Sequence, residues 1–241
     1  MTTLLRVEDV AKNYGALKAI DNLSFSVDAG EALGILGPNG AGKSTLFNLI
    51  AGDVAPSAGS IRFKGRDITH LPSYERCRLG IGRSYQIPQP FGRMTVFENV
   101  LAAASFASGR GEAACYDFSI EMLERTGLLT KANIIAEQLT LLERKRLELA
   151  RALATRPTLL LLDEIAGGLT DGECQELLTT INLVKSGGVS IVWIEHVVHV
   201  LISFVDRLLV INFGKHLAEG GPHAVMADTA VQEVYMGIEA E

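Results

Sequence analysis

The sequence is poor in several features that would each mark a class of protein. Its 241 residues include only 3 cysteines, Cys77, Cys115 and Cys174, which stand far apart and form no C-x-x-C pair. Such a set predicts neither a disulfide framework nor a zinc site, and it suits a reducing compartment. Acidic residues outnumber basic ones, with a formal net charge of −6. We therefore expect no polyanion-binding surface and no nucleic-acid partner.

Long apolar runs are also missing. No uninterrupted apolar stretch approaches the ~20 residues that a membrane-spanning helix needs. The most apolar region, 197–211, is interrupted by His199, Asp206 and Arg207. At the N-terminus, Glu8 and Asp9 fall where a signal peptide would have its apolar core. We expect no direct membrane insertion, so that any membrane association would come through a partner.

What the sequence does contain is a glycine-rich stretch from Gly34 to Thr45 with the pattern G-x-x-x-x-G-K-[ST]. An apolar run precedes it and apolar residues at helical spacing follow it, so it lies between a strand and a helix. Glycines let backbone N–H groups turn toward an anion, and the helix start adds its positive end. This context predicts a phosphate-binding loop for a nucleoside triphosphate. The predicted binding residues are Gly37, Pro38, Asn39, Gly40, Ala41, Gly42, Lys43, Ser44 and Thr45.

Several side chains near this loop have the types that phosphoryl transfer needs. Lys43 would reach the β- and γ-phosphates, and the Ser44 hydroxyl would bind Mg²⁺. A buried-strand pattern of four leucines, 159–162, ends in Asp163 and Glu164. Asp163 would hold the same Mg²⁺, and Glu164 would orient or polarise the attacking water. His196 follows a further apolar strand, where an imidazole would reach the γ-phosphate.

The order of elements predicts an α/β fold. Apolar strands that alternate with helices indicate a P-loop NTPase (RecA-like) core with a mostly parallel sheet. Alternating strands within 1–30 and 59–65 predict a small antiparallel β-subdomain, whose first two strands are expected at 4–10 and 23–27 with Tyr14 between them. Helical patterns over about 88–155 predict an inserted helical subdomain. A helical tail is expected at the C-terminus, and 1–241 is expected to form one domain. Ligands of such sheets bind at the carboxyl ends of strands, where this arrangement places Gln86 with the residues above.

Taken together, these landmarks resemble the ATPase subunit of an ATP-binding-cassette (ABC) transporter over essentially the full length. The resemblance implies that Tyr14 stacks on adenine, that Gln86 senses Mg²⁺ and the attacking water, and that His196 is a switch histidine. It implies that 167–170 crosses to a second ATPase subunit and that permease subunits contact the chain near Gln86–Met94. The implied protein is a Mg²⁺-dependent ATPase that binds ATP on the cytoplasmic, inner face of the cell membrane as a peripheral subunit.

Two stretches narrow the resemblance. The first stretch runs from Gly80-Ile-Gly-Arg-Ser-Tyr-Gln-Ile-Pro-Gln-Pro-Phe91 to Met94-Thr-Val-Phe-Glu-Asn-Val100, and the second is 207–214 with 218–220. Both are similar to those of the hydrophobic (branched-chain) amino-acid uptake family. Relatives in that family also import amides and urea. The resemblance therefore implies the ATP-binding and ATP-hydrolysing subunit of an importer for hydrophobic amino acids or related amides.

One stretch departs from the family pattern. The family signature reads Leu-Ser-Gly-Gly-Gln, and the corresponding residues here are Leu139, Thr140, Leu141, Leu142 and Glu143. In the family, this loop is presented in trans to the γ-phosphate held by the other subunit. A leucine at 142 adds a branched side chain there and disfavours positive φ, although Arg144 or Lys145 would supply charge instead. We expect weakened closure, and a heterodimer with unequal sites ahead of a homodimer.

One alternative function stays open, and two others are disfavoured by the sequence. A regulatory or scaffold subunit that binds ATP with little turnover is favoured by Leu142, whereas Glu164 and His196 argue against it. A soluble P-loop kinase lacks its acceptor-site features here. An ABC protein of DNA repair or translation would show tandem cassettes or a long coiled coil and a basic surface, neither of which this sequence has.

Overall fold

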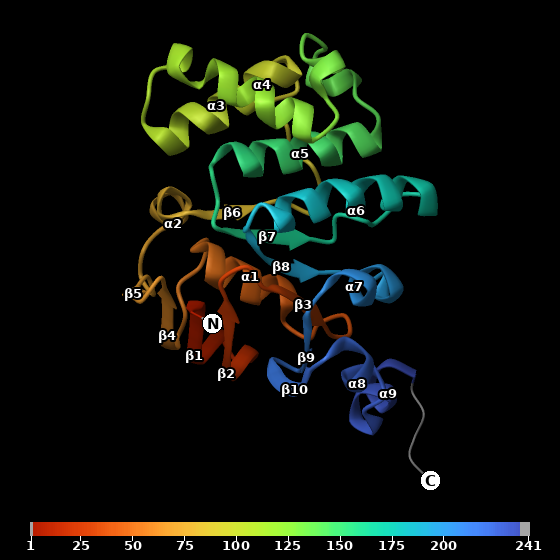
Figure 1. Cartoon of the computed structure of the whole chain (residues 1–241). Coiled ribbons are helices and arrows are strands. Elements are labelled where there is room, and N and C mark those ends of the chain that lie inside the picture. The colour runs from red at the N-terminus through yellow and green to blue at the C-terminus, as the bar shows by residue number, and fades with distance from the viewer. Residues whose placement is uncertain (1, 237–241) are drawn as a thin grey trace.

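The computed structural model describes residues 2–236, which form two sheets with helices around them (Figure 1). The larger sheet has the strand order β10-β9-β3-β8-β7-β6. Its strands are β3 (Ala32–Leu36), β6 (Ile81–Arg83), β7 (Leu159–Asp163), β8 (Ser190–Ile194), β9 (Arg207–Asn212) and β10 (Lys215–Gly220). All neighbours are parallel except β10, which runs antiparallel to β9. This mostly parallel sheet confirms the predicted α/β fold class.

The central strands are buried on both faces, because side chains alternate between two cores. In β7, Leu159 and Leu161 pack into one core together with α1 (Lys43–Ala51) and the second sheet. Leu160 and Leu162 point the other way, into the core formed with the helices of the opposite face. The same alternation in β3, β8 and β9 explains why these strands read as continuous apolar runs.

The smaller sheet is antiparallel, with the order β2-β1-β4-β5. It consists of β1 (Thr3–Tyr14), β2 (Leu17–Asp28), β4 (Ala58–Phe63) and β5 (Arg66–Asp67). The sequence pattern predicted shorter first strands, 4–10 and 23–27, with Tyr14 in the segment between them. That was wrong, because β1 and β2 stay paired up to the turn, where Tyr14 lies opposite Leu17. Tyr14 is therefore held at the end of a hairpin.

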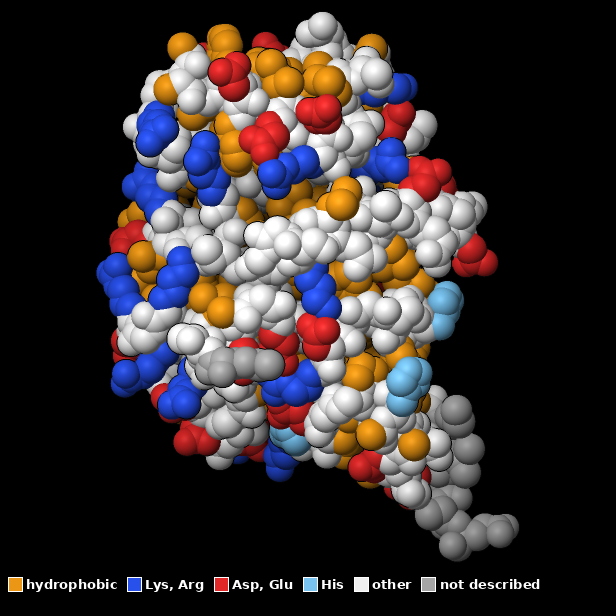
Figure 2. All heavy atoms as spheres, viewed as in Figure 1, with side chains coloured by type: hydrophobic (Ala, Val, Ile, Leu, Met, Phe, Trp, Pro, Cys, Tyr) orange, Lys and Arg blue, Asp and Glu red, His pale blue; other side chains and the backbone are white. Residues whose placement is uncertain are grey.

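A helical part covers one end of the larger sheet. It contains α3 (Val96–Ser108), α4 (Tyr116–Arg125) and α5 (Leu141–Ala154), and Figure 1 shows α5 between the other two and the sheet. α2 (Ser73–Leu79) leads into β6. Three helix starts carry a Thr-x-x-Glu capping box, in which two backbone N–H groups are satisfied reciprocally: Thr95/Glu98, Thr140/Glu143 and Thr170/Glu173. Figure 2 shows hydrophobic side chains at the surface of this part, and Phe106, Tyr116 and Ile120 are among the exposed ones.

The last third of the described chain contains α6 (Asp171–Ser186), α7 (Val198–Phe204), α8 (Pro222–Met226) and α9 (Thr229–Met236). The sequence pattern missed β10 between β9 and α8. This strand lies at the sheet edge and has no fully buried residue, so it lacks the alternation that marks a half-buried strand. The rest of the predicted helical tail, 237–241, lies outside the described residues. No helix within 2–236 is both long enough and apolar enough to span a membrane.

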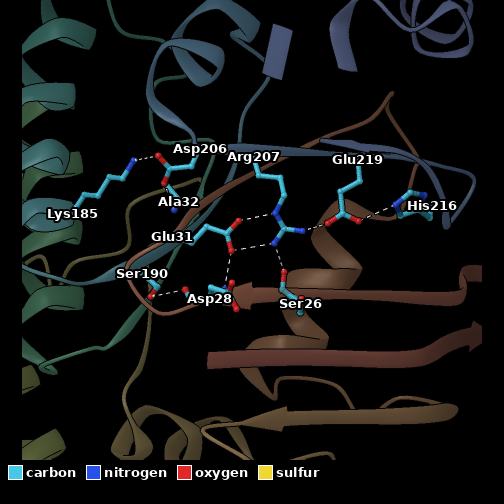
Figure 3. Close-up of polar contacts among 10 residues, drawn as sticks. All are labelled: Ser26, Asp28, Glu31, Ala32, Lys185, Ser190, Asp206, Arg207, His216 and Glu219. Carbon is cyan, nitrogen blue, oxygen red and sulfur yellow. Dashed lines mark hydrogen bonds and ion pairs between the residues drawn. The ribbon is translucent and has the colours of Figure 1, made fainter. Parts of the chain in front are cut away.

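Arg207 joins the two sheets at the edge where the parallel strands begin (Figure 3). Its Nε donates to Oε1 of Glu31 over 2.6 Å, and its terminal nitrogens contact the backbone carbonyl of Ser26 in β2 and the carboxylate of Glu219 in β10. Nε2 of His216 lies 3.0 Å from the other Glu219 oxygen. This partly buried network fixes the antiparallel sheet against the core, and it leaves the opposite edge, where the strands end, for a ligand.

Candidate functional site

The glycine-rich loop connects β3 to α1 and packs closely against neighbouring backbone. A Cβ at Gly37 would lie 2.4 Å from the carbonyl oxygen of Ile211, and one at Gly42 would lie 2.4 Å from that of Ala19. Gly42 also has a φ of 102°, which side chains rarely allow. Both positions therefore require glycine, and the loop conformation is fixed by β9 on one side and β2 on the other.

Lys43, the first residue of α1, lies inside this loop. Its Nζ donates to the carbonyl oxygens of Gly37 at 2.7 Å and Pro38 at 3.0 Å. Burial lowers the pKa of Lys43, and the nearby carboxylates of Glu164 and Asp163 partly offset that effect. The loop thus holds a buried amine beside backbone N–H groups at a helix start, which is a combination that attracts phosphate.

A cavity of about 420 Å³ opens over the loop. Residues 39–45 form one side of it, and Glu164 and His196 reach it from the ends of β7 and β8. Tyr14 and Phe213 line it as well, and both are exposed, the Phe213 side chain by 80%. The family resemblance implied Tyr14 here but gave no reason to choose Phe213, which reaches the cavity from the turn between β9 and β10.

Glu164 is contacted from both sides by the two other predicted catalytic residues. Nε2 of His196 lies 2.6 Å from its Oε1, and the side-chain amide of Gln86 donates to its Oε2. The backbone of Glu164 has a φ of 48°, and its N–H donates to the carbonyl oxygen of Ile194 over 2.9 Å. A left-handed conformation costs a residue other than glycine roughly 1–2 kcal/mol. The surrounding structure therefore holds this carboxylate in a strained, defined position.

Asp163, the last residue of β7, is buried and ion-paired. Its side chain is 8% exposed, and its Oδ2 accepts from Nη2 of Arg83 over 3.0 Å. Burial raises the pKa of the Asp163 carboxyl, and Arg83 opposes that rise. The sequence pattern predicted Asp163 and assigned no role to Arg83, which lies 80 residues earlier.

Two further buried charges lie behind Glu164, and the sequence gave them no role at this place. Nζ of Lys145 donates to the backbone carbonyl of Glu164 over 3.4 Å. Glu195 accepts from the N–H groups of Ala166 at 2.6 Å and His196 at 3.1 Å. Burial lowers the pKa of Lys145 and raises that of Glu195. These groups brace the two strand ends that carry the predicted catalytic side chains.

The divergent signature has a different backbone from the one expected. Thr140 caps α5, Leu141 and Leu142 are its first two residues, and no residue of 139–143 has a positive φ. The expected conflict between leucine and a left-handed backbone is therefore absent, and what remains is side-chain bulk at an exposed helix start. Leu141 is 46% exposed. None of Thr140–Glu143 lines the cavity over this chain's own phosphate loop.

The two basic residues expected to compensate for the lost glycines are bonded within the chain. The guanidinium of Arg144 donates to the carbonyl oxygens of Leu139 at 3.0 Å and Glu137 at 2.7 Å. Lys145 is 5% exposed and points at Glu164 of its own chain. Both side chains contact backbone carbonyls of their own chain, and the expectation that one of them supplies charge to a partner's phosphate stays a prediction.

The segment that follows Gln86 is attached to the helical part. Nη1 of Arg151 donates to the Gln89 carbonyl oxygen over 2.9 Å, and its guanidinium lies 5.1 Å from the ring centre of Phe91. The fully buried amide of Asn99 bonds both the N–H and the carbonyl of Phe91, at 2.8 Å and 3.1 Å. A shift of α3 or α5 would therefore move the loop that carries Gln86.

Comparison with known proteins agrees with this geometry. A family model described as ABC transporter matches residues 20–167. The chain is 35% identical to the high-affinity branched-chain amino acid transport ATP-binding protein LivG of Salmonella typhimurium, over 97% of this chain and 98% of that protein. It is 32% identical to the lipopolysaccharide export system ATP-binding protein LptB of Haemophilus influenzae, over 98% of each.

The fold comparison leads to the same family. A solved ATP-binding cassette of an ABC transporter in its ADP conformation is 31% identical and has a TM-score of 0.90, with 99% of this chain and 100% of that chain covered. The likeness spans both sheets and the helical part, so it includes every element that contributes to the cavity. The chain belongs to the ABC transporter family, as one of its ATP-binding ATPase subunits.

Proposed function

We propose that this chain binds Mg²⁺ and ATP together and hydrolyses ATP to drive an importer of branched-chain or other hydrophobic amino acids. The observation that carries the proposal is the position of Glu164, which lies between Gln86 and His196 at the cavity over the phosphate loop. A carboxylate oriented in this way suits the polarisation of a water for in-line attack on phosphorus. The same trio argues against a scaffold subunit without turnover.

The roles of the binding residues follow from the surfaces they offer. Lys43 would exchange its bonds to loop carbonyls for bonds to the β- and γ-phosphates. The backbone N–H groups of 39–45 would donate to the same phosphates. The exposed ring of Tyr14 would pack on adenine. These groups bind and orient the nucleotide, and they leave the γ-phosphate facing Glu164.

The oxygen ligands present fit Mg²⁺. Ser44, Asp163 and Gln86 offer hydroxyl, carboxylate and amide oxygens, which a hard cation prefers. Within residues 2–236 no group of three or more His, Cys, Asp or Glu side chains is gathered as a metal site. The remaining ligands would therefore be phosphate oxygens and water, as is usual for this ion. When bound, Mg²⁺ neutralises charge that develops on the phosphates.

The partners follow from the parts of the chain that are exposed near the site. Two ATPase subunits would face each other, with 167–170 and Thr140–Glu143 directed at the other subunit's nucleotide. We propose a heterodimer, because the bulk of Leu141 and Leu142 would impair the site built on the partner's phosphate loop. Permease subunits would dock near Gln86–Met94, which places the chain peripherally at the cytoplasmic face of the membrane.

The transported solute is tested on the complete transporter. The chain is purified with the permease and ATPase subunits encoded beside it, reconstituted in liposomes, and supplied with the cognate binding protein. We expect ATP hydrolysis and solute uptake to rise with leucine, isoleucine or valine. Stimulation by amides or urea alone would shift the proposal to those solutes. ATP-dependent movement of a lipid-linked glycan with no response to amino acids would contradict import.

A further inference from the structure

The side chain of Arg83 is bound by acceptors from three separate elements. Nη2 donates to Oδ2 of Asp163 at the end of β7, over 3.0 Å. Nη1 donates to Oδ1 of Asn48 in α1 over 2.7 Å and to Oδ2 of Asp53 beyond α1 over 2.8 Å. The guanidinium also lies 4.9 Å from the ring centre of Tyr85. With its side chain only 10% exposed, this cation is held in one orientation.

The contact with Asp163 engages Oδ2 of the carboxylate, and this carboxylate lies near Lys43 of the phosphate loop. Both partners are largely buried, at 10% and 8% side-chain exposure, so neither charge is left unpaired. A buried ligand carboxylate whose second oxygen is bonded to a rigid guanidinium cannot rotate away from the metal position. Arg83 therefore touches the candidate metal ligand without reaching the nucleotide cavity itself.

The same guanidinium also lines a second cavity, of about 310 Å³, between β6, α2, α3 and α5. Asp53, Tyr85 and Arg151 are among the side chains that line it with Arg83. Arg151, which lines this cavity, also donates to the Gln89 carbonyl oxygen, so the cavity adjoins the loop near which the permease is proposed to dock. One buried side chain thus contacts Asp163 with one nitrogen and a cavity-lining carboxylate, Asp53, with another.

We propose that Arg83 is a positioning residue for Asp163 and that it transmits changes in this second cavity to the metal ligand. A permease segment that enters the cavity and displaces Asp53 breaks one hydrogen bond of the guanidinium. The guanidinium is then free to move relative to Asp163. The affinity of the Asp163 site for a divalent metal therefore depends on whether the second cavity is occupied. The positioning of Asp163 needs only the isolated chain, whereas the link to transport rests on the proposed function.

The test measures Mn²⁺ binding to the full-length chain with a non-hydrolysable ATP analogue, by the electron paramagnetic resonance signal of free Mn²⁺. Arg83→Gln is expected to weaken Mn²⁺ binding by about tenfold, the lower end of the loss seen when a bonded partner of a metal ligand is removed. Arg83→Lys is expected to bind Mn²⁺ with an affinity between those of the wild type and Arg83→Gln, since a single ammonium replaces the forked guanidinium. Analogue binding in EDTA is expected to stay unchanged. Arg78→Gln, an exposed arginine of α2, is the matched control and is expected to bind Mn²⁺ like the wild type.

The role of the second cavity is tested by a double-mutant cycle. Asp53→Asn is expected to weaken Mn²⁺ binding less than Arg83→Gln does, and the double variant is expected to match Arg83→Gln alone. Fully additive losses would overturn the transmission through Arg83. Unchanged Mn²⁺ affinity in Arg83→Gln, with only a lower melting temperature, would show a purely structural residue and overturn the positioning role. If Arg83→Gln does not fold, the Mn²⁺ affinity and the melting temperature of Arg83→Lys are compared with those of the wild type instead. Failure of the wild type to bind the analogue would instead contradict the proposed function.

Discussion

Nε2 of His196 lies 2.6 Å from Oε1 of Glu164, although 32 residues separate them in the chain. They meet because β7 and β8 are parallel neighbours whose carboxyl ends lie side by side. Gln86 approaches the other oxygen of the same carboxylate from the loop after β6, the next strand in the sheet. Three consecutive strands thus place three polar side chains around one reacting position.

His196 is expected to act on turnover through Glu164. In His196→Ala the carboxylate loses a partner that orients it, so kcat for ATP hydrolysis should fall by about 100-fold, the lower range for a positioned acid–base group. Nucleotide affinity should change little, because the phosphate loop remains intact. His199→Ala, an exposed histidine in α7, serves as the control. An equal loss of turnover in both variants would contradict the role of His196.

The bulk of Leu142 is expected to limit hydrolysis by this chain on its own. Leu142→Gly should raise steady-state ATP hydrolysis of the isolated chain, because it clears the helix start that we propose faces the second nucleotide. It should also cost about 1 kcal/mol of stability, since glycine disfavours helix. Leu183→Gly, at a 63% exposed position in α6, is expected to cost a similar amount without raising hydrolysis. An unchanged rate in folded Leu142→Gly would mean that the divergent signature works and would favour a homodimer.

Glu195 is expected to make stability depend on pH. Burial raises the pKa of Glu195 above the ordinary 4.5, so the folded chain holds this proton more tightly than the unfolded chain. Its contribution to stability is fully present below pH 4.5 and is lost as the pH rises through the raised value. The melting temperature of the wild type, relative to Glu195→Gln, should therefore fall as the pH rises above 4.5. Glu233→Gln, at an exposed position of α9, is the matched control, and an equal pH-dependent fall relative to this variant would contradict the role of burial.

Much of the fold could be predicted because its signals are local. The apolar run at Leu159–Asp163 predicts a buried strand. The phosphate-loop motif predicts a turn, a following helix and the binding of an anion. The hairpin end at Tyr14 and the edge strand β10 were missed because their pairing extends beyond any apolar pattern. The bounds that separate the subdomains, and the roles of the individual site residues, stay predictions.

The groups that support the site could not be found in the sequence. Arg83, Lys145 and Glu195 carry charges that look ordinary along the chain, and their meaning comes from burial beside Asp163 and Glu164. The opposite error occurred at Leu142, where a family pattern predicted backbone strain. The structure instead has a capped helix start at Thr140, in which leucine is unstrained.

The most direct test of the account replaces Glu164 by glutamine in this chain within the complete transporter and measures steady-state, Mg²⁺-dependent ATP hydrolysis. We predict a loss of at least about 100-fold with nucleotide binding retained, because in the proposed function this carboxylate activates the water and Leu141 and Leu142 impair the second site. Retention of half or more of the hydrolysis would contradict the account, since it would mean either that the other site hydrolyses equally or that Glu164 does not act on the attacking water.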